Sequence, residues 1–587
     1  MANGKADVTE KGLYLIWLLL AIAAVAVVFF CGSELPYWDD WVLVPVLSGK
    51  QPLDVAWLAA AQNEHRLPLS RLLMWTAWRA TGDGCRIVLI ADVLLLAWAA
   101  RLLMLTTARL RQGPGWADVL IPVLLLHWGH MENLLWSSQL CAFSAIWLFF
   151  VAASMLARDV KAWRPQQLAL ACGSVILLPL HMGVGVAMTP GCAAALAVAA
   201  VELIRSPDIQ LRRRGAIAAT AAVVACLGAA ALVAAYTPVA KYRPDAYDFG
   251  PTLRAVLQCA GTSVGVWGRI PLLTGMAVLG FSAFSAGAGF LVWRRRPQDK
   301  PLILRLLLLL LAAWTVALVI GWGRVRFGAT TERYSLLSVP ILGCGLMLCA
   351  LYRFPPRGRK WCATILLGGA AIWAANMIYG WSYAKQRLSG SQAVRRDIAD
   401  GLPLVEIVGR NWFRWAPSES MFRDGLSTLR DQRIIPFGDI ARDPPYEVRT
   451  ILESAASGAG RPHGVDLSLA GRPRRDYRLS KPTHVLAIRT RWIVPEGAKW
   501  IDYAVEWSLG PPAAGKDTTG ITFYGHILRD REIIQTTWVD ATIDAVGVRL
   551  CAESTQPFLA LRKALGLGPA GPHGPFTLAG VELLVRR

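Results

Sequence analysis

Long apolar segments recur along the first two thirds of this chain, and they constrain its fold more than any other feature. A helix of about 20 apolar residues crosses the roughly 30 Å hydrocarbon layer of a membrane, and it satisfies its own backbone hydrogen bonds there. We expect spans at 13–31, 87–107, 117–129, 141–157, 168–182, 186–204, 215–236, 272–293, 302–321, 335–352 and 361–380. With 55% hydrophobic and 17% charged residues, the sequence predicts a polytopic α-helical membrane protein with about 11 transmembrane helices.

The orientation in the membrane follows from the basic residues in the short connections. The first apolar run follows Lys5 and Lys11 but is not followed by a small-x-small cleavage pattern, so we expect a retained anchor. Basic residues gather in alternate connections: Arg109, Arg111, Arg158, Lys161, Arg164, Arg205, Arg212 to Arg214, Arg294 to Arg296, Lys300 and the stretch 353–360. The positive-inside rule then predicts a cytoplasmic N-terminus and an extracytoplasmic segment after about residue 381. The predicted location is the bacterial inner (cytoplasmic) membrane.

Net charge and cysteines exclude other classes. The formal charge of +21 lies largely in those connections, so it sets topology and predicts no nucleic-acid partner. Most of the cysteines fall inside apolar runs without a CxxC pair, which indicates neither a disulfide framework nor a thiol metal site.

Three regions follow from the change in pattern along the chain. We expect a transmembrane catalytic domain at 1–380, a helical extracytoplasmic linker at 381–460, and a β-sandwich-like extracytoplasmic domain at 461–587, where short alternating strands are separated by Gly and Pro breaks. Within the first domain, the segments at about 32–86, 129–140, 237–271 and 322–334 face outward. The first of them is rich in Trp and is typical of helices that lie among lipid headgroups.

The first outward segment carries the strongest candidate for catalysis. Asp39 and Asp40 are adjacent carboxylates just past the first span, where burying two charges is costly. We interpret one of them as a general base, with helix capping or a salt bridge to Arg66 as the alternative. Glu64, His65 and Arg66 follow in the same segment, and we expect them to line a substrate site.

The second outward segment interrupts apolar helices with polar side chains. His130, Glu132, Asn133 and Gln139 lie there at membrane depth, where unpaired polar groups are expensive. We therefore expect a function for this segment, with His130, Asn133 and Gln139 as substrate-binding residues. The spacing of the histidines and Glu132 does not match HExxH, so no metal site is predicted.

Arginines mark the last outward segment. Arg324, Arg326 and Arg333, with Tyr334, can surround a phosphate because guanidinium groups bind oxyanions in a bidentate manner. The alternative is that these arginines only reach the headgroups. Acids in the first two segments and arginines in the last suit a deprotonated nucleophile and an anionic leaving group. That chemistry fits sugar transfer from a polyprenyl phosphate.

At these residues the chain resembles the GT-C superfamily of integral membrane glycosyltransferases. It is also similar to bacterial membrane proteins with WDxW, NEHR and RYS-like elements, matched at Trp38 to Trp41, Asn63 to Arg66 and Arg333 to Ser335, over roughly residues 10–380. The resemblance implies that Asp39 or Asp40 is the base and that Glu132 takes the place of the second-loop acid. His-Met-Glu-Asn stands where an Asp pair is usual, which leaves the use of a divalent metal open.

The expected function is therefore inverting transfer of a sugar from a polyprenyl-phosphate donor to a cell-envelope glycan or lipid acceptor, without a cofactor. A transporter or flippase of lipid-linked saccharides is one alternative, and a polymerase is another. No inverted repeat is visible in the sequence, and the acids and arginines gather on one predicted face, which favours the enzyme.

Overall fold

The computed structural model describes residues 2–81, 84–236, 248–325, 332–352, 359–443, 446–453, 465–467, 474–493, 500–508, 519–527, 532–550 and 576–586. Its residues form two compact units, Met1–Ser391 and Gln392–Arg587, and each is described by itself. The predicted boundary at 380/381 falls inside one continuous helix, α16 (Arg359–Ala399). The predicted division into three regions stays a prediction.

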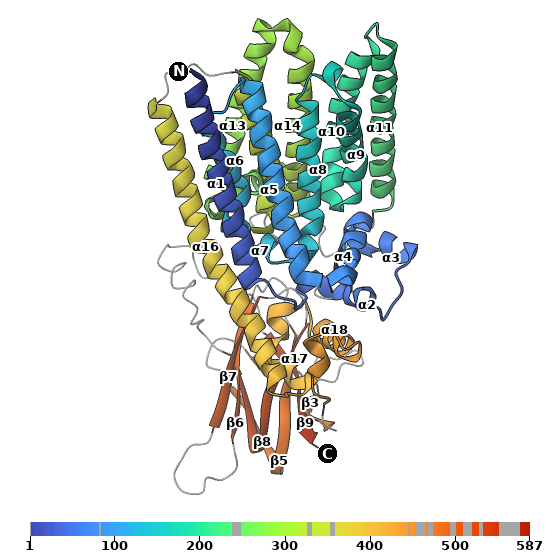
Figure 1. Ribbon diagram of the computed structural model, residues 1–587. Coiled ribbons are helices and arrows are strands. Elements are labelled where there is room, and N and C mark those ends of the chain that lie inside the picture. The colour runs from blue at the N-terminus through green and yellow to red at the C-terminus, as the bar shows by residue number, and fades with distance from the viewer. Residues whose placement is uncertain are drawn as a thin grey trace. The chain divides into compact units, whose positions relative to one another are not determined.

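Membrane-length helices dominate the first unit and run alongside one another (Figure 1). Eight helices in the described part of the chain are long and apolar enough to span a membrane, which confirms a polytopic helical membrane protein. They are α1 (Ala2–Cys31), α5 (Gly84–Arg111), α8 (Leu140–Leu156), α10 (Met182–Ile204), α11 (Ile209–Ala234), α13 (Pro271–Arg295), α14 (Lys300–Gly323) and α15 (Ser335–Tyr352).

Three of the eleven expected spans are not among these eight. The segment 117–129 is broken into η2 (Trp116–Val119), α6 (Leu120–Leu126) and η3 (Trp128–His130), because His127 is extended and ends α6. The segment 168–182 forms α9 (Pro165–Leu177) and then η6 (Leu178–Leu180), an apolar stretch shorter than a span. The segment 361–380 lies in α16, where the side chains of residues 359–366 are outside the described ones.

Helix α8 occupies the centre of the bundle. In its apolar window 94% of the residues are buried, against 28% in the windows of α1 and α11. A helix that is apolar on every side belongs in the interior, while α1 and α11 present one side to lipid. Packing on all sides therefore holds the N-terminal end of α8 in place, and the outward segments can be described relative to it.

Short elements connect these helices. Between α1 and α5 lie η1 (Trp38–Val42), α2 (Val44–Leu47), α3 (Val55–Ala59), the paired strands β1 (Ala61–Gln62) and β2 (His65–Arg66), and α4 (Pro68–Thr81). In Figure 1, α2, α3 and α4 lie at the end of the bundle away from the N-terminus. The remaining connections contain α7 (Met131–Leu134), η4 (Ser137–Gln139), η5 (Val160–Ala162), α12 (Phe249–Gly261), η8 (Thr262–Arg269), η9 (Pro297–Asp299) and η10 (Glu332–Tyr334).

The second unit combines two helices with one antiparallel sheet. The helices are α17 (Leu404–Trp415) and α18 (Glu419–Asp431), followed by η11 (Phe437–Asp439). The strands are β3 (Tyr446–Glu453), β4 (Val465–Leu467), β5 (Arg474–Ile493), β6 (Trp500–Ser508), β7 (Thr519–Ile527), β8 (Glu532–Leu550) and β9 (Phe576–Arg586). Their order is β3-β9-β5-β8-β6-β7, and β4 pairs with β9.

The sheet confirms the β-rich C-terminal region that the alternating pattern predicted. The described strands of this unit pair in one continuous antiparallel order. Val405 of α17 forms an apolar cluster with Leu486, Ala487 and Leu584 of the sheet. Helix α17 thus covers part of an apolar face of the sheet.

Candidate functional site

The Asp40 carboxylate connects the first outward segment to η4, the short helix that directly precedes α8. Its Oδ2 accepts hydrogen bonds from the Ser137 hydroxyl at 2.7 Å and from the Tyr37 backbone N–H at 3.0 Å. Its Oδ1 accepts from the Ser138 backbone N–H at 2.9 Å and from the Ser138 hydroxyl. Only 3% of the residue is exposed. Burial raises the pKa of the Asp40 carboxyl, and these hydrogen bonds oppose the rise. Asp40 is therefore a buried anchor with donors on both oxygens.

Asp39 lies in a different environment from its neighbour. It is half-buried, and its Oδ2 is 3.4 Å from the Asn63 amide nitrogen. Asn63 has a φ of 53° and opens the turn between β1 and β2, a conformation that Asn tolerates well. The Gln62 side chain also donates to the Asp39 carbonyl at 3.3 Å. The hairpin thus places Asp39 at the accessible side of the pair.

Arg333 connects the predicted acids with the arginines that were predicted to surround a phosphate. Its backbone N–H donates to the Glu132 carboxylate at 3.1 Å, and its guanidinium carbon lies 5.6 Å from the Tyr334 ring centroid. Burial lowers the pKa of Arg333, but Tyr334 and the charges of Glu132 and Asp39 outweigh it, so the pKa is raised. Residues from three outward segments therefore act on one guanidinium.

An aromatic and cationic cluster that sequence reasoning missed adjoins this group. The Arg387 guanidinium of α16 lies 3.4 Å from the Tyr37 ring centroid, and it donates to the Leu135 carbonyl at 3.2 Å. Tyr37 also packs edge-on against Trp136. Burial raises the pKa of the Tyr383 phenol, as do its contact with Tyr37 and the charge of Glu132. Arg387 lay in the predicted linker, so no membrane motif indicated it.

A second charged group forms at the other side of the hairpin. Arg324 pairs with Glu64 at 3.7 Å. Burial, with a smaller effect from the Arg324 charge, lowers the pKa of His65 to about 4. A Cβ at Gly183 would lie 3.0 Å from the His65 ring, a tight contact that the glycine of α10 avoids. Glu64, His65 and Arg324, which were predicted as binding residues, are thus neighbours.

Strained backbone marks the same region. Trp38, Asn63 and Met182 all have positive φ values, of 49°, 53° and 57°, although none of them is glycine. The Met182 sulfur lies 3.4 Å from the Cys141 sulfur of α8. Such conformations cost free energy and persist where the surrounding structure fixes them, often at functional sites.

Two predicted binding residues are engaged within the chain. Arg66 donates to the Ala235 carbonyl from Nε at 3.3 Å and from Nη2 at 3.1 Å, and also to the Ala59 carbonyl. It caps the end of α11, where a cation meets the negative end of the helix dipole. His130 is fully buried, with Nδ1 2.7 Å from the Ser335 hydroxyl and Nε2 3.0 Å from the Leu124 carbonyl. Burial lowers its pKa to about 4. These contacts disfavour the binding roles predicted for Arg66 and His130.

The other predicted residues are less informative about binding. Asn133 is completely buried, and neither polar atom of its side chain has a hydrogen-bond partner in the described part of the chain. Gln139 is 8% exposed at the end of η4. Arg326 lies outside the described residues.

Asp92 is a further acid that the sequence reasoning missed. It lies within α5, is completely buried, and has no hydrogen-bond partner on either oxygen among the described residues. Its charged form is repelled by the charge of Asp40. The signal was present in the sequence, because an aspartate inside an apolar run is a functional candidate by default.

The described residues contain no group of three or more His, Cys, Asp or Glu side chains that could hold a metal ion. The arrangement instead offers carboxylates beside guanidinium groups. Chemically, it can accept a proton and hold an anion in one place.

Comparison with known proteins adds one finding. No family model matches this chain, and no curated protein matches it. Among solved structures, the crystal structure of ArnT from Cupriavidus metallidurans bound to undecaprenyl phosphate is similar at 16% sequence identity, over 72% of this chain and 77% of that chain. The TM-score is 0.35, and a likeness this loose carries no argument about function. The function is therefore argued from the residues of this chain.

Proposed function

We propose that this protein is a membrane glycosyltransferase of the GT-C type. It transfers a sugar from a polyprenyl-phosphate donor to a hydroxyl group of a cell-envelope glycan or lipid on the extracytoplasmic face. The observation that carries the proposal is the hydrogen bond from the Arg333 backbone to Glu132, with the Asp39 carboxylate, from a third outward segment, close enough for its charge to act on Arg333.

Asp39 is the base in this proposal, and Asp40 holds it in place. Both Asp40 oxygens already accept hydrogen bonds from Tyr37, Ser137 and Ser138 in a buried setting. A carboxylate so engaged is a poor acceptor for a substrate proton. Asp39 is the more exposed of the two and lies near the Arg333 charge.

The proposed chemical step joins the acceptor hydroxyl to the sugar of the donor. The Asp39 carboxylate takes the proton of the acceptor hydroxyl while the hydroxyl oxygen attacks the anomeric carbon. The bond from that carbon to the phosphate oxygen breaks, and the electron pair leaves with the polyprenyl phosphate. A single displacement of this kind inverts the anomeric configuration.

Arg333 is suited to stabilise the leaving phosphate. Arg333 is half-buried and its Nε is shielded from solvent, and a preorganised cation in a site of low dielectric stabilises developing negative charge strongly. Arg387 supplies a second cation from α16 beside Tyr37. Glu132 holds the backbone of Arg333, so we assign Glu132 a positioning role.

The test compares Asp39→Asn with Asp54→Asn, a matched change in the same segment. Asp54 caps α3 through the Trp57 N–H, and asparagine caps helices equally well. Purified variants are assayed for sugar transfer from a polyprenyl-phosphate donor to envelope acceptors. We expect Asp39→Asn to reduce transfer by about 10²–10⁴-fold and Asp54→Asn to leave it unchanged. Wild-type transfer by a folded Asp39→Asn variant would overturn the assignment.

The burial of Asp92 within α5 supports a second candidate function, the transport of lipid-linked sugars. An acid buried in a membrane helix is typical of proton-coupled carriers. If the protein is a flippase, the wild type moves a fluorescent lipid-linked sugar across the membrane of vesicles and forms no product of sugar transfer. Asp92→Asn then abolishes that movement. A glycosyltransferase forms that product in detergent, where no membrane separates two compartments.

A further inference from the structure

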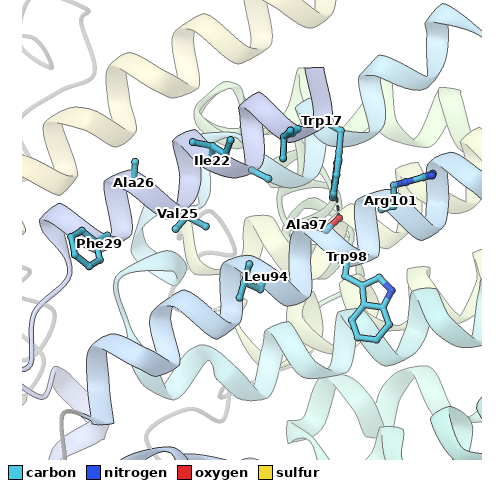
Figure 2. A pocket seen from close by; sticks show the side chains of 11 residues that line it. Trp17, Ile22, Val25, Ala26, Phe29, Leu94, Ala97, Trp98 and Arg101 are labelled. Atoms are coloured by element: carbon cyan, nitrogen blue, oxygen red, sulfur yellow. Dashed lines mark hydrogen bonds between the residues drawn. The ribbon is translucent and has the colours of Figure 1, made fainter. Parts of the chain in front are cut away.

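A groove of about 620 Å³ lies between α1 and α5. Figure 2 shows Trp17 and Arg101 at one end of it and Phe29 at the other. Its volume falls within the range of about 300–1,000 Å³ that is usual for small-molecule sites. None of the residues predicted for catalysis or substrate binding lines it.

Small residues create the groove, and large ones form its edges. Ala21 and Ala97 are nearly buried at 9% and 4% exposure, whereas Ile22, Leu94 and Trp98 are each more than half exposed. The Trp17 indole N–H donates to the Ala97 carbonyl at 2.9 Å, which holds the two helices together at that end. The exposed edges belong to two predicted membrane spans, so the groove opens toward lipid.

Arg101 is the charged residue among those that line the groove. Its guanidinium carbon lies 3.8 Å from the centroid of the Tyr14 ring, and the charge of Glu10 attracts it as well. A guanidinium has several N–H donors, so one carboxylate does not exhaust it. An arginine within a membrane helix is costly and calls for an anionic partner.

We propose that the groove binds an anionic phospholipid, with one acyl chain between α1 and α5 and the phosphate at Arg101. The helical rise of about 1.5 Å per residue puts Phe29 about 18 Å from Trp17. The hydrocarbon of one leaflet is about 15 Å deep. An acyl chain whose phosphate lies at Arg101 therefore extends along the groove past the bilayer midplane, and its headgroup falls at the charged end.

This lipid is distinct from the proposed sugar donor. Asp39 and Asp40 follow the last residue of α1, Cys31, whereas Arg101 lies beside Tyr14 and Trp17. Along α1 these positions are separated by about 20 Å. A phosphate held by Arg101 cannot be the phosphate that leaves at Arg333, so the inference does not rest on the proposed function.

The test is native mass spectrometry of the protein released from nanodiscs that contain phosphatidylethanolamine and phosphatidylglycerol in equal amounts. We expect the wild type to retain phosphatidylglycerol preferentially and Arg101→Gln to lower that preference about five-fold, the effect of one basic residue at an anionic lipid. Arg294→Gln is the matched control, because its guanidinium lies 4.7 Å from the Phe290 ring centroid, away from the groove.

A second variant tests the acyl chain. Ala26→Phe fills part of the groove without altering charge, and we expect it to reduce retention of both lipids. Equal preference in Arg101→Gln and Arg294→Gln would overturn the phosphate assignment. Displacement of phosphatidylglycerol by added polyprenyl phosphate would overturn the choice of lipid and assign the groove to the donor.

Discussion

Replacing each aspartate of the Asp39-Asp40 pair should separate stability from catalysis. In Asp40→Asn, the retained oxygen still accepts from the Ser138 N–H and hydroxyl, while the new amide group faces the Ser137 hydroxyl and the Tyr37 N–H. The hydroxyl can turn and accept. The Tyr37 N–H cannot, so a donor faces a donor across 3.0 Å.

The expected loss follows from that single mismatch. A hydrogen bond to a charged group contributes about 1.5–3 kcal/mol, and the remaining bonds weaken when the charge is removed, so we expect Asp40→Asn to cost about 2–4 kcal/mol. Asp39→Asn alters a half-buried group whose contact with Asn63 is 3.4 Å. Its cost should be about 1 kcal/mol or less.

The assay pairs thermal unfolding in detergent with sugar transfer by the surviving folded fraction. Asp40→Asn should unfold several degrees below Asp39→Asn, yet retain more activity per folded molecule. Equal unfolding midpoints would refute the anchoring role of Asp40. Equal loss of activity per folded molecule would refute the assignment of the base to Asp39.

Other outcomes follow from the same contacts. Arg333→Met should lower kcat for transfer by about 10²–10³-fold, and Arg333→Lys should have an intermediate effect. Arg324→Met should change KM more than kcat. Steady-state kinetics with the purified variants measures both constants. Burial and then the Arg324 charge lower the pKa of His65 from 6.5 to about 4, so the unfolded state binds that proton more readily. The contribution of neutral His65 to the free energy of unfolding is therefore fully present above pH 6.5 and decreases as the pH falls toward 4. His65→Gln should flatten this part of the plot of unfolding free energy against pH, and an unchanged slope would contradict the prediction. Arg66→Met should destabilise the protein by about 0.3–1 kcal/mol, since it removes a cation from the exposed C-terminal end of α11. An unfolding midpoint equal to that of the wild type would exclude the capping role.

The helical framework was predictable because it depends on local chemistry. An apolar run of sufficient length must form a helix in lipid, and eight such helices are found where the sequence placed them. The two shorter segments show the limit of that reasoning. At 117–129 the apolar composition is helical, but the extended backbone at His127, whose Nδ1 accepts from the Gly129 N–H, ends α6 early.

The sheet of the second unit illustrates a similar limit. Alternating residues in β5 and β8 indicated strands with one apolar face, and those strands are present. The pattern does not say what covers that face. In the structure Val405 of α17 packs there, because an amphipathic helix buries an apolar face as well as a second sheet does.

The sequence by itself determined that acids and arginines of distant segments gather at one end of a helical membrane bundle, since topology follows from apolar length and basic connections. Only the tertiary structure decided their contacts. Asp39 and Asp40 are chemically identical neighbours, and they differ because Ser137 and Ser138 of η4 hydrogen-bond to both carboxylate oxygens of Asp40 and bury it. Likewise, Arg66 donates to the end of α11, and the Arg333 backbone N–H donates to Glu132. A side chain's role depends on which distant groups desolvate it and bind it, and those contacts exist only once the helices have packed.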